Sequence, residues 1–345
     1  MKPLILGIVL GLVLPVPETA PPRGRVERVV VHGASLEGNL EGDSPDRSVS
    51  IYLPPSYETH KERRYPVLYM LHGFTDTDEL WFGPTKHWIN LPSVLDRAWR
   101  GAGAREVIVA MPSAFTRYEG SMYSSSPVTG DWEEFIRREL VAFVDAHYRT
   151  LPRAESRALA GHSMGGYGSL RIGMKSPEVF SSLYLLSPCC LTPRHFTGSD
   201  EDLVAAEAIR SPKEVAEAEF GTKILLASAA AWSPDPQNTP LLLALPSRHG
   251  EIQAAVLAKW TANAPLAVID QHIGSLRRLR GLAFDAGGAD EGIAASIREL
   301  DSVLNAYQVP HAFEIYDGDH LNRIAERIET KVVPFLSKNL VFDAH

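Results

Sequence analysis

The apolar positions of this chain follow two different spacings, and the changes between them predict where strands and helices lie. Apolar and β-branched residues predict two leading antiparallel strands at 26–31 and 48–53. The apolar run Val67–Leu71 predicts a buried strand, and the stretch Glu106–Pro112 predicts a further one. Residues Asp131–Tyr148 carry apolar side chains at helical spacing, with Asp131 as the N-cap, and we interpret their aromatic residues as core packing.

The same alternation continues towards the C-terminus. Short apolar runs predict strands at 157–160, 183–187, 281–286 and 313–316, and the pattern at 167–175 predicts a helix directly after the first of these strands. Strands that alternate with helices imply an α/β fold, in which helices cover both faces of a mostly parallel central sheet.

Residues 188–280 are too many for one crossover helix between two of these strands. Helical patterns occur at 200–209, 212–219 and 251–260, and a Pro/Asn-rich break lies at 233–240. We interpret this segment as a cap inserted over the functional site, where it would shape the substrate pocket. The alternative is a structural excursion packed on one side of the domain.

The N-terminus has the pattern of a targeting segment. Lys2 precedes an almost wholly apolar run, Pro3–Val16, which is too short for a convincing membrane span but suits a secretory signal. We therefore predict a signal peptide at 1–20, with an uncleaved anchor as the alternative, and a folded domain at 25–340. A secreted or periplasmic location and no stable membrane partner after cleavage follow from this hypothesis.

Composition narrows the function classes. The 345 residues are 45% hydrophobic and 22% charged, with a net charge of −8 and no long basic run, so nothing favours a nucleic-acid partner. The two cysteines, Cys189 and Cys190, are adjacent and predict buried apolar residues rather than a disulfide framework. The histidines lack metal-ligand spacing, so we expect neither a metal nor a cofactor.

The most informative motif is Gly161-His162-Ser163-Met164-Gly165, which fits G-x-S-x-G. A predicted strand precedes it and a predicted helix follows it. This context is that of a nucleophile elbow, in which a strained turn holds the serine hydroxyl above the sheet. The flanking glycines are required because a Cβ atom there would clash with the neighbouring strand or helix.

A nucleophilic serine needs a base and a group that orients the base. His320 follows the last predicted strand, and we expect it to be the base. Asp290 follows the preceding strand and is the favoured acid, while Asp285 and Asp319 remain alternatives. His162 adjoins Ser163, but the elbow turns its side chain away from the hydroxyl, and we expect it to pack beside the sheet.

The oxyanion hole requires two backbone N–H groups. Met164 supplies the one that follows the nucleophile. His72-Gly73-Phe74 follows a buried strand, and the glycine allows a sharp turn that presents the Phe74 N–H. A further loop, 112–130, comes after a central strand, so we expect its Tyr118, Tyr123 and serine run to face the site.

These motifs resemble the esterase D-like branch of the α/β-hydrolases, which includes feruloyl, acetylxylan and enterochelin esterases, S-formylglutathione hydrolases and mycolyltransferases. The matching segments run through most of the chain. They are Tyr52-Leu53-Pro54-Pro55-Ser56-Tyr57, Pro66 to Gly73, Tyr148-Arg149-Thr150, Gly161 to Gly168, Gly287-Gly288-Ala289-Asp290 and Gly318-Asp319-His320. The resemblance implies an α/β-hydrolase fold with Ser163, Asp290 and His320 as triad and Phe74 and Met164 as oxyanion donors.

We therefore expect a serine carboxylic-ester hydrolase that forms an acyl-enzyme on small acyl or aromatic, feruloyl-like esters. The substrate would be a small molecule or an ester attached to a polysaccharide. The alternatives are an acyltransferase or thioesterase of the same fold, and a catalytically silent binding protein. The motifs serve acyl chemistry, so they leave the physiological ester and the oligomeric state open.

Overall fold

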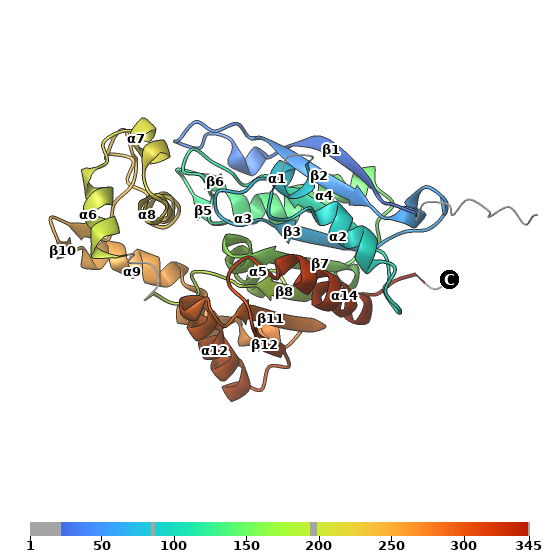
Figure 1. The fold of residues 1–345 in the computed structure, drawn as a ribbon. Helices are drawn as coiled ribbons and strands as arrows, with labels where there is room; N and C mark the ends of the chain where they lie inside the picture. The colour runs from blue at the N-terminus through green and yellow to red at the C-terminus, as the bar shows by residue number, and fades with distance from the viewer. Residues whose placement is uncertain (1–21, 84–86, 194–198, 344–345) are drawn as a thin grey trace, which may run out of the picture.

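Eight strands form one sheet at the centre of this computed structural model, which describes residues 22–83, 87–193 and 199–343 (Figure 1). Their order is β1-β2-β4-β3-β7-β8-β11-β12. The first two pairings, β1 with β2 and β2 with β4, are antiparallel, and all the others are parallel. The strands are β1 (Arg25–His32), β2 (Asp46–Leu53), β3 (Val67–Leu71), β4 (Ile108–Pro112), β7 (Arg157–His162), β8 (Ser182–Leu186), β11 (Gly281–Gly287) and β12 (Ala312–Tyr316).

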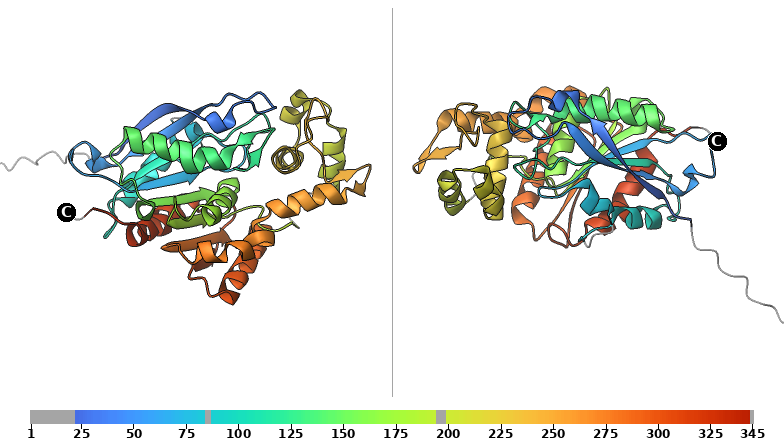
Figure 2. Two further views of the ribbon diagram at one scale, coloured as in Figure 1. Left: turned by 180° about the vertical axis from the view of Figure 1, so that it is seen from behind. Right: turned by 90° about the horizontal axis from the view of Figure 1, so that it is seen from above.

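Helices cover both faces of the sheet, as the alternating pattern predicts (Figure 2). One face packs against α3 (Trp132–Glu134), the π-helical turn η3 (Phe135–Leu140), α4 (Val141–His147), α5 (Met164–Lys175) and α12 (Glu291–Ala306). The other packs against α1 (Asp78–Phe82), α2 (Leu91–Ala98), α13 (Ile324–Arg327), η7 (Ile328–Val332) and α14 (Val333–Asn339). Asp131 caps the first group, because its carboxylate accepts a hydrogen bond from the Glu134 N–H.

Residues 188–280 are here called the β8–β11 segment, and the helices α6 to α9 of this segment lie beyond one end of the sheet (Figure 1). Its elements are α6 (Asp200–Ala208), α7 (Pro212–Glu217), α8 (Phe220–Trp232), β9 (Ser247–Arg248), β10 (Glu251–Ile252), α9 (Ala254–Asn263), α10 (Pro265–Val268), η6 (Ile269–His272) and α11 (Ile273–Leu276). The remaining short elements are η1 (Ala34–Leu36), η2 (Pro55–Tyr57), β5 (Ser125–Ser126), β6 (Gly130–Asp131) and η4 (Ala154–Ser156).

One expectation for this segment was wrong, and one helix was missed. The pattern at 251–260 predicted one helix, but Glu251–Ile252 pairs with β9 and the helix begins only at Ala254. Helix α8 was not predicted, although it is the most deeply buried helix of the segment. It is apolar on nearly every side, so it lacks the one-sided periodicity by which a surface helix is recognised.

Side-chain contacts connect α8 to the loop between β4 and β5. The Trp232 indole N–H lies 3.1 Å from the Ser124 hydroxyl, and the Ser126 hydroxyl donates to the Ala230 carbonyl at 2.7 Å. The β8–β11 segment is therefore packed against the end of the sheet at which the parallel strands terminate.

The structure describes the two cysteines but not the predicted leader. The signal-peptide prediction, residues 1–20, lies outside the described residues. Cys189 and Cys190 are buried and unbridged, as expected. Within the described ranges, no helix is long and apolar enough to cross a membrane.

Candidate active site

Ser163 lies between β7 and α5, on the turn that the G-x-S-x-G motif predicts. Its φ and ψ are 56° and −115°, a conformation that residues with a side chain rarely adopt. The turn is possible because both flanking glycines are in close contact with backbone. A Cβ atom on Gly161 would lie 2.3 Å from the Gly165 carbonyl carbon, and one on Gly165 would lie 2.0 Å from the Leu71 carbonyl oxygen.

His320 and Asp290 form a direct pair at the same edge of the sheet. His320 lies in the loop after β12, and Asp290 lies between β11 and α12. His320 Nδ1 is 2.5 Å from Asp290 Oδ2, with the side chains 34% and 20% exposed. Because a carboxylate oxygen accepts this bond, Nδ1 carries the proton and Nε2 is the nitrogen left to act on a neighbouring group.

The two alternative acids have other partners. Asp285 is fully buried on β11, where its carboxylate accepts hydrogen bonds from Arg327 at 2.7 Å and from the Tyr184 hydroxyl at 2.7 Å. Burial raises the pKa of Asp285, and the Arg327 charge opposes this effect. Asp319 accepts the backbone N–H groups of Leu321 and Asn322, which lowers its pKa.

The structure brings Ser163 to the same edge as His320 but does not join them. The hydrogen bonds of the described residues include none between the Ser163 hydroxyl and the His320 ring. Such contacts are often long in a protein without substrate and shorten when substrate binds. The serine, histidine and aspartate thus follow the ends of three strands, and only the last two are in contact.

The turn after β3 adjoins the nucleophile. A Cβ atom on Gly73 would lie 3.6 Å from Ser163 Cβ, which is van der Waals contact, so this turn is a direct neighbour of the serine. The side chains of Phe74 and Met164 both contact Gly120, where a Cβ atom would lie 2.5 Å from Phe74 Cδ2 and 2.8 Å from Met164 Sδ. Neither backbone N–H donates to any other group in the described part of the chain.

His72 fixes this turn. Its side chain is fully buried, and its Nε2 accepts the Ala114 N–H at 2.8 Å while its Nδ1 donates to the Gly73 carbonyl at 2.8 Å. Burial lowers the pKa of His72, which favours the neutral ring that these two bonds require. His72 therefore supports the β3 turn from within the core.

The expectation for the loop after β4 was wrong in one respect. Tyr118 and Tyr123 are almost completely buried and have partners of their own: Tyr118 donates to the Leu241 carbonyl, and Tyr123 donates to the His72 carbonyl at 3.3 Å. These aromatic rings hold the loop in place instead of facing a ligand. Within the loop, Glu119 forms an ion pair with Lys223 of α8 at 2.8 Å.

His162 has a contact that the sequence does not predict. Its side chain reaches the loop that carries His320. Its Nε2 lies 2.9 Å from the His320 carbonyl oxygen, and the two ring centroids are 4.7 Å apart.

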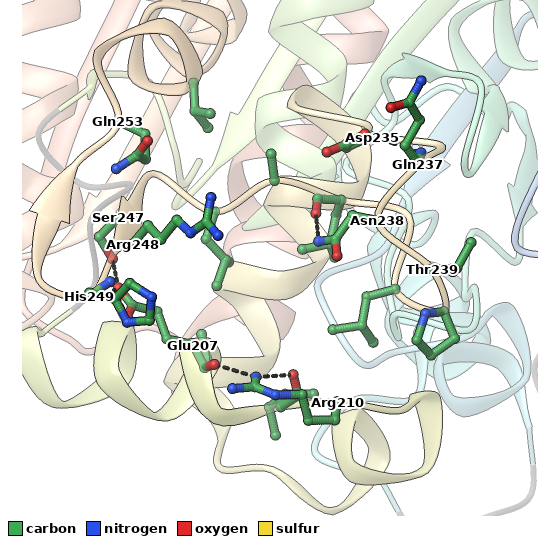
Figure 3. Close-up of a pocket in the computed structure, with 18 residues that line it drawn as sticks. Glu207, Arg210, Asp235, Gln237, Asn238, Thr239, Ser247, Arg248, His249 and Gln253 are labelled. Carbon is green, nitrogen blue, oxygen red and sulfur yellow. Dashed lines mark hydrogen bonds between the residues drawn. The ribbon is translucent and has the colours of Figure 1, made fainter.

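A cavity of about 640 Å³ lies within the β8–β11 segment (Figure 3). Leu241 and Leu243 contribute apolar surface, and Arg210, Asn238 and Arg248 contribute polar groups. Neither Ser163, Asp290 nor His320 lines it, so it is separate from the candidate catalytic groups. No group of three or more potential metal ligands occurs among the residues that the structure describes.

The chain matches a known protein family and is similar in sequence to known esterases. The model of a family described as "Putative esterase" matches residues 44–323. "Esterase Rv1288" of Mycobacterium tuberculosis is 31% identical over 142 residues, which are 39% of this chain and 27% of that protein. "Endo-1,4-beta-xylanase/feruloyl esterase" of Xylanibacter ruminicola is 30% identical over 145 residues, 41% of this chain and 19% of that protein. The matched regions thus span less than a third of either relative.

Solved structures show the same fold. A ferulic acid esterase superposes with a TM-score of 0.62 at 20% identity, covering 92% of this chain and all of that one. S-formylglutathione hydrolase from Staphylococcus aureus superposes with a TM-score of 0.61 at 14% identity, covering 91% of this chain and 99% of that one. At these identities the likeness establishes the α/β-hydrolase architecture alone.

Proposed function

Because this chain belongs to the "Putative esterase" family, we propose that it is a serine carboxylic-ester hydrolase that works through an acyl-enzyme. The observation that carries the proposal is the 2.5 Å contact between His320 Nδ1 and Asp290 Oδ2, at the sheet edge where the β7–α5 turn holds Ser163. These are the three parts that nucleophilic acyl transfer requires: a hydroxyl on a strained turn, an imidazole and a carboxylate that orients it.

The proposed reaction has two steps. The Ser163 hydroxyl attacks the ester carbonyl, and His320 Nε2 takes its proton and passes it to the departing alcohol oxygen. Water then attacks the acyl-serine, with His320 again accepting a proton and returning it to Ser163. Asp290 keeps Nδ1 protonated and stabilises the imidazolium that forms in each step.

In this mechanism, the backbone N–H groups of Phe74 and Met164 stabilise the negative charge that develops on the ester carbonyl oxygen. Both are without an acceptor in the described structure, and the two residues pack around Gly120 beside the nucleophile. Donors that are fixed before the reaction stabilise the developing charge without having to reorganise. Removing one such donor typically costs about 10²–10³-fold in rate.

We propose small acyl or aromatic esters, including feruloyl-like ones, as the substrates. An aromatic surface lies next to the oxyanion turn: Phe220 of α8 is 60% exposed, and its ring packs edge to face on Phe74 at 5.7 Å. The relative from Xylanibacter ruminicola carries feruloyl esterase in its name. We assign the β8–β11 segment the role of a cap, because Phe220 extends it to the edge of the site.

The proposed setting is an exported enzyme whose ester is a small molecule or is attached to a polysaccharide. This part of the proposal depends on the apolar run at Pro3–Val16. It is tested by determining the N-terminus of the mature protein in the cell envelope and culture medium.

The activity is tested with p-nitrophenyl esters from acetate to laurate and with methyl ferulate, on the wild-type protein and on Ser163→Ala. The proposal requires hydrolysis that vanishes in Ser163→Ala and a burst of p-nitrophenol in the wild type. Transfer to an added alcohol in preference to water would assign an acyltransferase, and preference for a thioester would assign a thioesterase. A folded wild-type protein that is inactive on all of them would indicate a binding protein.

A further inference from the structure

The residue before the nucleophile, His162, binds the backbone of the proposed base. It is the last residue of β7, and its side chain is 2% exposed. Its Nε2 is 2.9 Å from the carbonyl oxygen of His320. Since a carbonyl oxygen can only accept a hydrogen bond, Nε2 must carry the proton.

The surroundings of the other ring nitrogen of His162, Nδ1, indicate whether the ring is charged. Its Nδ1 is buried and makes no hydrogen bond with any residue that the structure describes. A proton on this atom would be a buried donor without an acceptor, which costs about 1–3 kcal/mol. Burial, together with the neighbouring His320, lowers the pKa of His162 to about 3. The ring is therefore neutral, with its single proton on Nε2.

Aromatic side chains keep the His162 ring in place. Its centroid lies 6.2 Å from that of Trp81 and 5.4 Å from that of Trp88. Trp81 is itself fixed, because it is fully buried and its indole N–H donates to Asp76 Oδ2 at 2.8 Å. On another side, a Cβ atom on Gly73 would lie 3.3 Å from His162 Nδ1, so backbone closes that direction.

The loop that carries His320 has hydrogen bonds on either side of this residue, because Asp319 accepts the Leu321 and Asn322 N–H groups and the Gly318 carbonyl accepts the Ala289 N–H. The His320 side chain is 34% exposed, and the flanking Asp319 and Leu321 are exposed. Asp290 fixes the rotation of the His320 ring through Nδ1, but it does not fix the position of the backbone. The bond from His162 anchors the main chain at His320 itself, and together with the Asp290 contact it constrains where Nε2 of His320 lies.

We propose that His162 is a positioning residue for His320, which holds the base by its main-chain carbonyl and stays uncharged beside it. This inference rests on the proposed function, in which His320 becomes an imidazolium. The ring centroids are 4.7 Å apart, so a second positive charge on His162 would repel the one that forms during catalysis. The neutral ring supplies a donor without that repulsion.

The test compares His162→Gln with His162→Met. The two side chains have nearly the same length, but only glutamine retains an N–H donor. We expect His162→Met to lose about 10–100-fold in kcat on p-nitrophenyl acetate with KM little changed, because small displacements of catalytic groups have effects of this size. We expect His162→Gln to recover most of the loss.

Proton NMR provides a readout that a purely structural role would not affect. The strongly deshielded Nδ1 proton between His320 and Asp290 should weaken in His162→Met and persist in His162→Gln. Wild-type kcat and an unchanged resonance in His162→Met would overturn the inference. If His162→Met does not fold, ¹⁵N NMR of the wild type decides: His162 must stay neutral with its proton on Nε2 between about pH 5 and 9. Titration in that range, or a proton on Nδ1, would overturn the inference.

Failure of the inference can be distinguished from failure of the proposed function. Loss of activity in Ser163→Ala together with a fully active His162→Met would contradict only the role of His162. Full activity in Ser163→Ala would contradict the serine mechanism itself.

Discussion

The sheet edge that carries the candidate catalytic residues and the β8–β11 segment next to it are packed differently. At the sheet edge, a Cβ atom on Gly165 would lie 2.0 Å from the Leu71 carbonyl oxygen, so the nucleophile turn has no spare volume. In the β8–β11 segment a cavity of about 640 Å³ remains between the elements. We propose a division of roles in which the rigid edge carries the chemistry and the looser segment selects the ester.

The largest expected effect concerns the carboxylate at the rigid edge. We expect Asp290→Asn to lower kcat about 10⁴-fold, the effect of giving a triad histidine an amide partner that favours the wrong tautomer. The measurement is steady-state hydrolysis of p-nitrophenyl acetate with folding checked by circular dichroism.

Asp285→Asn is the matched control, because Asp285 lies on β11, just before the turn that carries Asp290, but pairs with Arg327. Breaking that buried pair should cost about 3–5 kcal/mol of stability and leave kcat per folded molecule nearly unchanged. A larger loss of kcat in Asp285→Asn than in Asp290→Asn would contradict the assignment of Asp290.

A pair of glycine substitutions tests the difference in packing. Gly165→Ala should lower the free energy of unfolding by about 3 kcal/mol or more, since the added methyl group meets backbone that cannot move aside. Gly274→Ala, in the helix α11, should be neutral or stabilise by up to about 1 kcal/mol. Urea unfolding measures both, and equal effects would show that the two regions do not differ in this way.

Two glutamates should make the stability of the fold depend on pH in opposite directions. Glu41, beside the β5–β6 hairpin, has both oxygens buried without a partner among the described residues, and burial raises its pKa to about 9. Its contribution to stability is complete below the unfolded pKa near 4.5 and is lost as pH rises towards 9. The slope is at most about 1.4 kcal/mol per pH unit. Glu41→Gln should flatten this decline.

Glu207 in the β8–β11 segment is the counterpart. Hydrogen bonds from the Ser247 hydroxyl and the His249 N–H lower its pKa, so its smaller contribution is present at neutral pH and disappears as pH falls below the usual range for a glutamate. Urea denaturation from about pH 4 to 9 separates the two. A Glu41→Gln variant that loses stability with rising pH as the wild type does would contradict the account of Glu41.

The smallest expected effect concerns the connection between the two regions. Lys223 of α8 and Glu119 of the β4–β5 loop pair at 2.8 Å with side chains 18% and 16% exposed. We expect Lys223→Met to cost about 1 kcal/mol, and a double-mutant cycle with Glu119→Gln to give coupling of similar size. Lys213→Met is the control, because Lys213 is 84% exposed and should have no measurable effect. Equal costs would indicate that the ion pair does not join the regions.

The comparison also explains how far the sequence predicts this molecule. The features of the sheet edge follow from local sequence patterns. Apolar runs form strands, and glycines flank Ser163 because a Cβ atom there would clash with neighbouring backbone. In the β8–β11 segment the rules failed, because α8 is buried on nearly all sides and carries no amphipathic pattern. The existence of this long segment was predictable from its length, and its helices were predictable only where one face meets water.

Within the candidate site, strand order predicted that Asp290 and His320 would follow successive strands and come to the same edge. The bond from His162 to the His320 carbonyl was not predictable, because it joins a β7 side chain to backbone 158 residues later. No local pattern encodes such a contact. It depends on how far the loop after β12 reaches across β11 and β8.

The central claim is that Ser163 is the nucleophile of an ester hydrolase. Its most direct test is intact-protein mass spectrometry after acid quenching of the reaction with p-nitrophenyl acetate, followed by peptide mapping. We predict one acetyl group per chain, located on Ser163, that is absent from Ser163→Ala and is released on further incubation in buffer. An acetyl group on another residue, or continued hydrolysis by Ser163→Ala, would contradict the account.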